Sequence, residues 1–77
     1  MDLNEFISAF SSQFEDTAPD LINGSTDFKN LAEWDSLIAL SVIALADEAY
    51  GVTLTGDDIR SANTVSDLFE KIKSRKA

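Results

Sequence analysis

The chain has 77 residues, and its 14 acidic and 6 basic side chains give it a formal net charge of −8 at pH 7. It contains neither histidine nor cysteine, which excludes a Ser-His-Asp triad, a cysteine nucleophile, a disulfide framework and a thiolate metal site. A body this acidic also repels nucleic acid and favours partners that have basic patches.

The size and the 44% of apolar residues indicate one small folded domain over residues 1–77. No apolar run reaches the roughly 18 residues that a membrane span needs. The first residues lack the basic start and apolar run of a signal peptide. We therefore expect a cytoplasmic monomer.

Charge is unevenly distributed along the chain. Residues 1–70 contain all 14 acids but only two bases, Lys29 and Arg60, and four more bases follow at the end. Cations are favoured near a helix C-terminus, so the basic end is expected to complement the last helix.

The first element predicted is an amphipathic helix over residues 3–15, where large apolar side chains recur at helical spacing: Leu3, Phe6, Ile7, Phe10 and Phe14. Residues 16–35 lose this period and contain turn-forming residues such as Pro19 and Gly24. Apolar residues still recur in this long loop: Leu21, Ile22, Phe28, Leu31 and Trp34. We expect the loop to pack across the helices, with Trp34 anchoring its end.

The second helix is predicted over residues 36–50, with Asp35 as its N-cap and Gly51 as its C-cap. Capping-box patterns at Thr55 and Thr64 predict a short third helix and a last helix. Residues 52–54 are too few and too isolated for a strand. The fold class is therefore all-α, a small bundle of three main helices and one short helix with a long first loop.

A helical wheel divides the second helix into two faces. Its core face is expected to contain eight residues: Ile38, Ala39, Val42, Ile43, Leu45, Ala46, Ala49 and Tyr50. The opposite face contains the serines and acids, and also a ridge formed by Leu37, Leu40 and Ala44. Exposed apolar residues beside Asp47 and Glu48 suit a docking surface for a partner. The alternative is that the long loop covers this ridge.

Ser36 begins this helix, and the chain offers no side chain to activate it. A function for Ser36 would thus depend on its modification by another protein; otherwise Asp35 and Ser36 form a plain helix cap. Asp35-Ser36-Leu37 opens the second helix, Glu48-Ala49-Tyr50-Gly51-Val52 ends it, and segments 55–59 and 64–68 follow. In these motifs and their order, residues 3–74 resemble the acyl carrier protein family.

The resemblance implies a carrier and not an enzyme. Ser36 would accept 4′-phosphopantetheine from coenzyme A through a Mg²⁺-dependent phosphopantetheinyl transferase, and the arm would carry acyl groups as thioesters. Asp35 would serve as N-cap and as a contact for the transferase. Acyl-loading, condensing and tailoring enzymes with basic patches would dock on six residues: Leu37, Leu40, Ser41, Ala44, Asp47 and Glu48. Candidates for lining an acyl pocket are Ile38, Val42, Leu45, Ile59, Ala62 and Leu68.

Two positions depart from the common family pattern. Ser41 lies where an acid is common, and Ile38 replaces a frequently polar residue. These changes favour a specialised acyl or polyketide-type pathway over housekeeping fatty-acid synthesis. A peptidyl or aryl carrier is one alternative, although residues 31–34 lack the glycine-rich approach usual in those domains. An unmodified acidic helical adaptor is the other.

Overall fold

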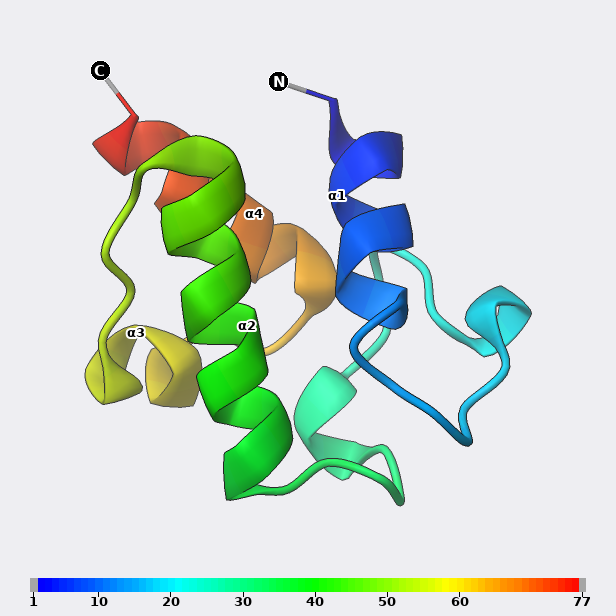
Figure 1. The fold of residues 1–77 in the computed structure, drawn as a ribbon. Coiled ribbons are helices and arrows are strands. Elements are labelled where there is room, and N and C mark those ends of the chain that lie inside the picture. The colour runs from blue at the N-terminus through cyan, green and yellow to red at the C-terminus, as the bar shows by residue number, and fades with distance from the viewer. Residues whose placement is uncertain (1, 77) are drawn as a thin grey trace.

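The computed structural model describes residues 2–76. Its α-helices are α1 (Leu3–Ser11), α2 (Ser36–Tyr50), α3 (Gly56–Ser61) and α4 (Val65–Arg75), as Figure 1 shows. Two 3₁₀ turns, η1 (Pro19–Leu21) and η2 (Phe28–Asn30), lie in the long connection from α1 to α2. Within residues 2–76 no strand forms, and the predicted all-α bundle is confirmed.

The start of α1 and the end of α4 lie at the same end of the bundle, and α2 begins at the opposite end (Figure 1). The short α3 lies beside the first half of α2, while α4 lies behind α2 in this view and packs against α1 and α3. The start of α2 is therefore bordered by α3 and by the long connection, and it lies away from the start of α1 and the end of α4.

The first helix is shorter than predicted, since it ends at Ser11 and not near residue 15. The Ser11 and Ser12 hydroxyls donate to the carbonyls of Ser8 and Ala9, and the N–H groups of Gln13 and Phe14 bond three residues back. Side chains that bond the backbone locally compete with helix continuation. Phe14 is nevertheless buried, so its apolar side chain indicates a position in the core and not a further turn of helix.

Aromatic rings run from the core toward the start of α2. Phe6 and Phe10 of α1 are fully buried, and Phe6 packs on Phe69 of α4 at a centroid distance of 5.5 Å. Phe10 meets Phe28 of η2 at 5.6 Å, and Phe28 meets Trp34 edge-on at 4.9 Å. The prediction that Trp34 anchors the loop end is confirmed.

The long connection packs across the helices through Ile22 and Phe28, as expected, but Leu21 is 63% exposed and that part of the prediction is wrong. Leu21 ends the η1 turn and points away from the core. Two carbonyls of the connection, those of Thr26 and Gly24, accept from the Val65 and Ser66 N–H groups at 3.1 and 2.8 Å. They satisfy N–H groups that the first turn of α4 cannot pair internally.

The predicted caps are confirmed. Asp35 Oδ1 accepts from the Ile38 N–H at 2.9 Å, and Gly51 takes the left-handed conformation (φ 67°) that glycine favours. Complete capping boxes begin α3 at Thr55 and α4 at Thr64. These contacts are local in sequence and fix where the helices begin.

The buried face of α2 is narrower than the wheel predicts. Val42 and Ala46 are fully buried, whereas Ala49 is exposed, which contradicts its predicted place in the core. A wheel takes no account of where the neighbouring elements end. The remaining predicted core residues are half-buried against the core: Ile38, Ala39, Ile43, Leu45 and Tyr50.

Candidate functional site

Ser36 is the first residue of the 15-residue α2 and is exposed. Asp35, its neighbour, is also exposed and caps the helix. The first N–H groups of a helix have no intrahelical partner, and the helix dipole is positive at this end. The hydroxyl of Ser36 therefore lies in a position that favours an anionic substituent.

A cavity of about 490 Å³ opens beside Ser36. Its walls come from the segment before α2, from α2 itself, from α3 and from η2: Lys29, Trp34, Asp35, Ser36, Ala39, Leu40, Ile43, Gly56, Ile59 and Arg60. Most of these side chains are apolar, and a volume of this order suits a small organic ligand.

The six predicted acyl-pocket residues occupy three different environments. Ile59 lines the cavity beside Ser36. Val42, Ala62 and Leu68 are fully buried in the core. Ile38 and Leu45 are half-buried against the core, and Ile38 also borders a second hollow, which Asp35 and Leu37 line as well. Ala39, Leu40 and Ile43 also line the cavity. The helical wheel assigns Ala39 and Ile43 to the core face and Leu40 to the ridge, because a wheel describes one helix and does not show where α3 lies.

The ridge on α2 is open to solvent. Leu37 is 72% and Leu40 is 62% exposed, and Ala44, Asp47 and Glu48 are exposed with them. The long connection does not cover these residues, so the alternative that it does is wrong. Ser41 is half-buried, and its hydroxyl donates to the Leu37 carbonyl at 3.2 Å. Leu40 belongs both to this ridge and to the cavity wall.

Glu33 supports the segment before Ser36, and the sequence interpretation did not single it out. Its carboxylate accepts from the N–H groups of Glu15 (2.8 Å) and Asp16 (3.0 Å) and from the Thr17 hydroxyl (2.8 Å). Desolvation opposes ionisation of Glu33, but these hydrogen bonds outweigh it and lower the pKa. The start of the long connection, just after α1, is thereby tied to the residues that lead into α2.

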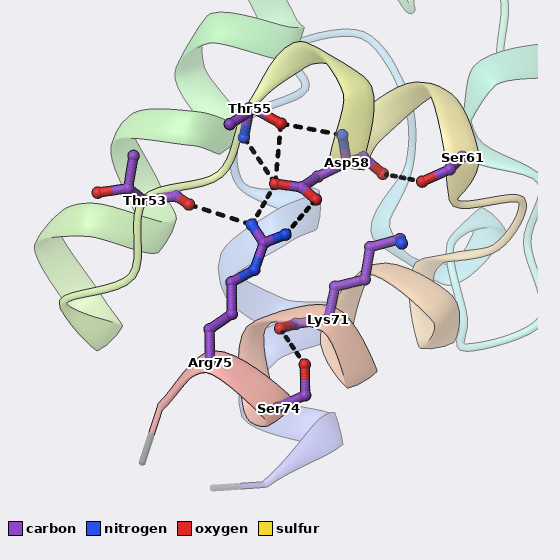
Figure 2. A network of polar contacts seen from close by, with 7 residues as sticks. All are labelled: Thr53, Thr55, Asp58, Ser61, Lys71, Ser74 and Arg75. Atoms are coloured by element: carbon purple, nitrogen blue, oxygen red, sulfur yellow. Dashed lines mark hydrogen bonds and ion pairs between the residues drawn. The ribbon is translucent and has the colours of Figure 1, made fainter.

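The short α3, which forms one wall of the cavity, is held by Asp58. Figure 2 shows the Asp58 carboxylate accepting from the Thr55 N–H at 2.8 Å and from the Arg75 guanidinium of α4, with Nη2 at 2.6 Å from Oδ1. Arg75 also donates to the Thr53 carbonyl at 3.3 Å. The basic end of the chain thus contacts α3 and the segment before it through Arg75. Its cations also lie in the last turn of α4, where the helix dipole favours positive charge.

None of the helices in residues 2–76 combines the length and apolar character required to cross a membrane. In the same range, no three acidic side chains gather closely enough to hold a metal ion.

An exposed serine in the first turn of a capped helix, beside an open apolar cavity and an exposed apolar ridge, suits a small helical carrier domain. The chain matches the family model "Phosphopantetheine attachment site" over residues 4–72 and belongs to that family. It is a phosphopantetheine-carrier protein, and the family's domain is the site of covalent 4′-phosphopantetheine attachment. The chain matches none of the curated proteins with which it was compared.

The residues around the start of α2 fit this group. The serine residue is exposed in the first turn of α2, at the positive end of the helix, and the adjoining cavity has apolar walls.

Proposed function

We propose that Ser36 receives the 4′-phosphopantetheine group and that the protein carries acyl intermediates as thioesters on it. The observation that carries this proposal is the exposed Ser36 hydroxyl at the start of α2, beside the cavity, in a chain of this family. Ser66 offers a useful contrast, because it lies in the first turn of α4 but is half-buried against the long connection.

In the attachment step, the Ser36 oxygen forms a bond to the phosphorus that bears the pantetheine of coenzyme A. The phosphoanhydride bond breaks, and adenosine 3′,5′-bisphosphate leaves with the bonding electrons. The hydroxyl proton passes to a base of the transferase, since this chain has no histidine. When attached, the group supplies the thiol that a cysteine-free chain lacks.

The helix end stabilises the product of this step. A singly charged phosphodiester at a helix N-terminus gains about 0.3–1 kcal/mol from the dipole at low ionic strength. Asp35 keeps the first turn of α2 in place through its bond to the Ile38 N–H. We assign Asp35 this capping role together with a contact to the transferase.

The cavity is the proposed site for the first carbons of the acyl chain. Trp34, Ala39, Ile43 and Ile59 give it apolar walls on several sides. Each methylene group removed from water contributes about 0.8 kcal/mol. Ile59 belongs to the predicted pocket, whereas Val42, Ala62 and Leu68 would support it from the core beneath.

Partner enzymes would dock on the ridge of α2. Leu37, Leu40 and Ala44 provide apolar contact, and Asp47 and Glu48 face basic groups of the partner. Ser41 makes this face less acidic, and Ile38 at its edge makes it more apolar, than is common in the family. We infer service to a specialised acyl or polyketide-type pathway on this basis.

Intact-mass spectrometry tests the attachment. Incubation with coenzyme A, Mg²⁺ and a promiscuous phosphopantetheinyl transferase should add one phosphopantetheinyl group to the wild type and to Ser66→Ala, but none to Ser36→Ala. A mass increase that persists in Ser36→Ala would show that the group is attached to another residue. No increase with several transferases would favour an unmodified adaptor.

A further inference from the structure

The two bases of residues 1–70 meet at the cavity beside Ser36. Lys29 and Arg60 are 31 positions apart, yet both line the cavity, and Lys29 Nζ donates to the Arg60 carbonyl at 2.7 Å. The same 70 residues contain all 14 acids of the chain. Both bases of this acidic part of the chain are thus gathered at one site.

The guanidinium of Arg60 folds back over the start of α3. A Cβ built at Gly56, another lining residue, would lie 3.4 Å from Arg60 Nη1. The guanidinium therefore lies close to the backbone of Gly56 at the cavity wall.

Both cations keep hydrogen-bond donors free. Arg60 pairs with Asp57, but both side chains are well exposed, and an exposed pair of this kind is weak. A guanidinium has five N–H donors and an ammonium has three. Arg60 donates to Asp57 and Lys29 donates to the Arg60 carbonyl, and these bonds use only some of the available N–H donors.

Asp35 is the one acid among the residues that line the cavity, against the two bases. Its Oδ1 is engaged by the Ile38 N–H at the helix cap. The lining therefore has a formal charge of +1, and its other side chains are apolar or hydroxylic. An anionic group that enters this cavity meets the cations and the positive end of α2 together.

We propose that Lys29 and Arg60 bind an anionic group of the arm on Ser36 and thereby hold the arm against the cavity. This inference rests on the proposed attachment to Ser36. Two groups have the required chemistry: the phosphodiester bonded to the Ser36 oxygen, and a carboxylate at the end of the carried acyl chain. The phosphodiester is the closer of the two to Ser36, because it is attached directly to it.

The test compares four forms of the protein: apo, holo, butyryl-holo and succinyl-holo. The two acyl groups have the same number of carbons and differ in a terminal carboxylate. Each form is made in the wild type, Lys29→Gln, Arg60→Gln and the charge-keeping Lys29→Arg. Lys73→Gln is the matched control, since it loses one charge at an exposed position of α4. The readouts are the thermal midpoint relative to apo protein and the ³¹P chemical shift.

If the phosphodiester is bound, the midpoint gain from apo to holo falls by at least half in Lys29→Gln and Arg60→Gln, and the ³¹P resonance moves. If a carboxylate is bound, the extra gain of succinyl over butyryl is lost in these two variants. Either result supports the proposal when Lys29→Arg and Lys73→Gln behave as the wild type and when added salt weakens the gain.

Equal midpoint gains and equal ³¹P shifts in all correctly modified variants would overturn the proposal and leave the attachment to Ser36 standing. Mass spectrometry of each sample separates this result from a failure of attachment, which would overturn both.

Discussion

Arg75 and Asp58 join the last turn of α4 to the first turn of α3 across 17 positions of sequence. The Asp58 side chain is 8% exposed and also completes the capping box of Thr55. One carboxylate thus caps the short helix and anchors it to α4. This matters for function because α3 contributes Gly56, Ile59 and Arg60 to the cavity beside Ser36.

We expect Asp58→Ala to destabilise the protein by about 1–3 kcal/mol, because it removes the cap and leaves the Arg75 guanidinium without its partner. Urea unfolding monitored through the single Trp34 measures this. Asp57→Ala is the matched control, since Asp57 is the adjacent residue but is exposed. Equal losses in the two variants would contradict the anchoring role of Asp58.

Stability should fall in acid through Asp58. The hydrogen bond from Arg75, with those from Thr55, lowers the pKa of Asp58 well below its usual range despite desolvation. A depressed pKa gives stability that is fully present above the unfolded pKa, about 3.9, and is lost as pH falls below it. Hydrogen bonds from Asn63 and Thr64 lower the pKa of Asp67 and act in the same direction.

Urea unfolding at pH 7, 4 and 3 should therefore show a smaller acid-induced loss in Asp58→Asn than in the wild type. The comparison is with each protein's own value at pH 7, so the lower starting stability of the variant does not affect it. An identical loss in both proteins would show that other carboxyl groups cause the acid sensitivity.

Glu33→Gln should loosen the segment that follows α1. The neutral amide is a weaker acceptor for the N–H groups of Glu15 and Asp16 than the carboxylate. Amide hydrogen exchange should become faster at these two residues and stay unchanged at Phe69 in the core. Glu48→Gln, at an exposed position of α2, controls for the loss of charge. Unchanged exchange at Glu15 and Asp16 would argue against the tether.

Filling the cavity should abolish the stabilisation that a carried acyl chain provides. Ala39→Leu places a larger side chain in the cavity wall, whereas Ala44→Leu makes the same change on the exposed face of α2. In the wild type, lengthening the acyl chain should raise the thermal midpoint with each added methylene until the cavity is full. That dependence should disappear in Ala39→Leu and persist in Ala44→Leu. If both variants keep it, the chain lies elsewhere.

Leu37→Ala should lower kcat/KM for the phosphopantetheinyl transferase about tenfold. A tenfold decrease corresponds to the loss of roughly 1.4 kcal/mol of interaction free energy with the transferase. Leu37 is exposed, so the unfolding free energy should change little. Leu21→Ala removes a similarly exposed leucine from η1 and should leave kcat/KM unchanged. Equal kinetics for both variants would remove Leu37 from the docking surface.

Short-range patterns of the sequence predicted much of the fold. The caps at Asp35, Gly51, Thr55 and Thr64 lie where residue type and spacing placed them, because each depends on hydrogen bonds within a few residues. The start of α2 at Ser36 was predictable for the same reason. The end of α1 was not, because Phe14 is buried by the core and not by a helical turn.

The contacts around the candidate site depend on how distant segments pack. The sequence placed Leu37 and Leu40 outside the core face of α2, but their exposure depends on the path of the long connection, which runs elsewhere. Lys29 and Arg60, like Asp58 and Arg75, are far apart in sequence and have no periodic relation. Periodicity and capping describe one element at a time, whereas a cavity wall or an ion pair between helices requires the relative positions of several. The serine that we propose as the attachment site therefore follows from the sequence, and its surroundings follow from the packing of α3 and η2 against α2.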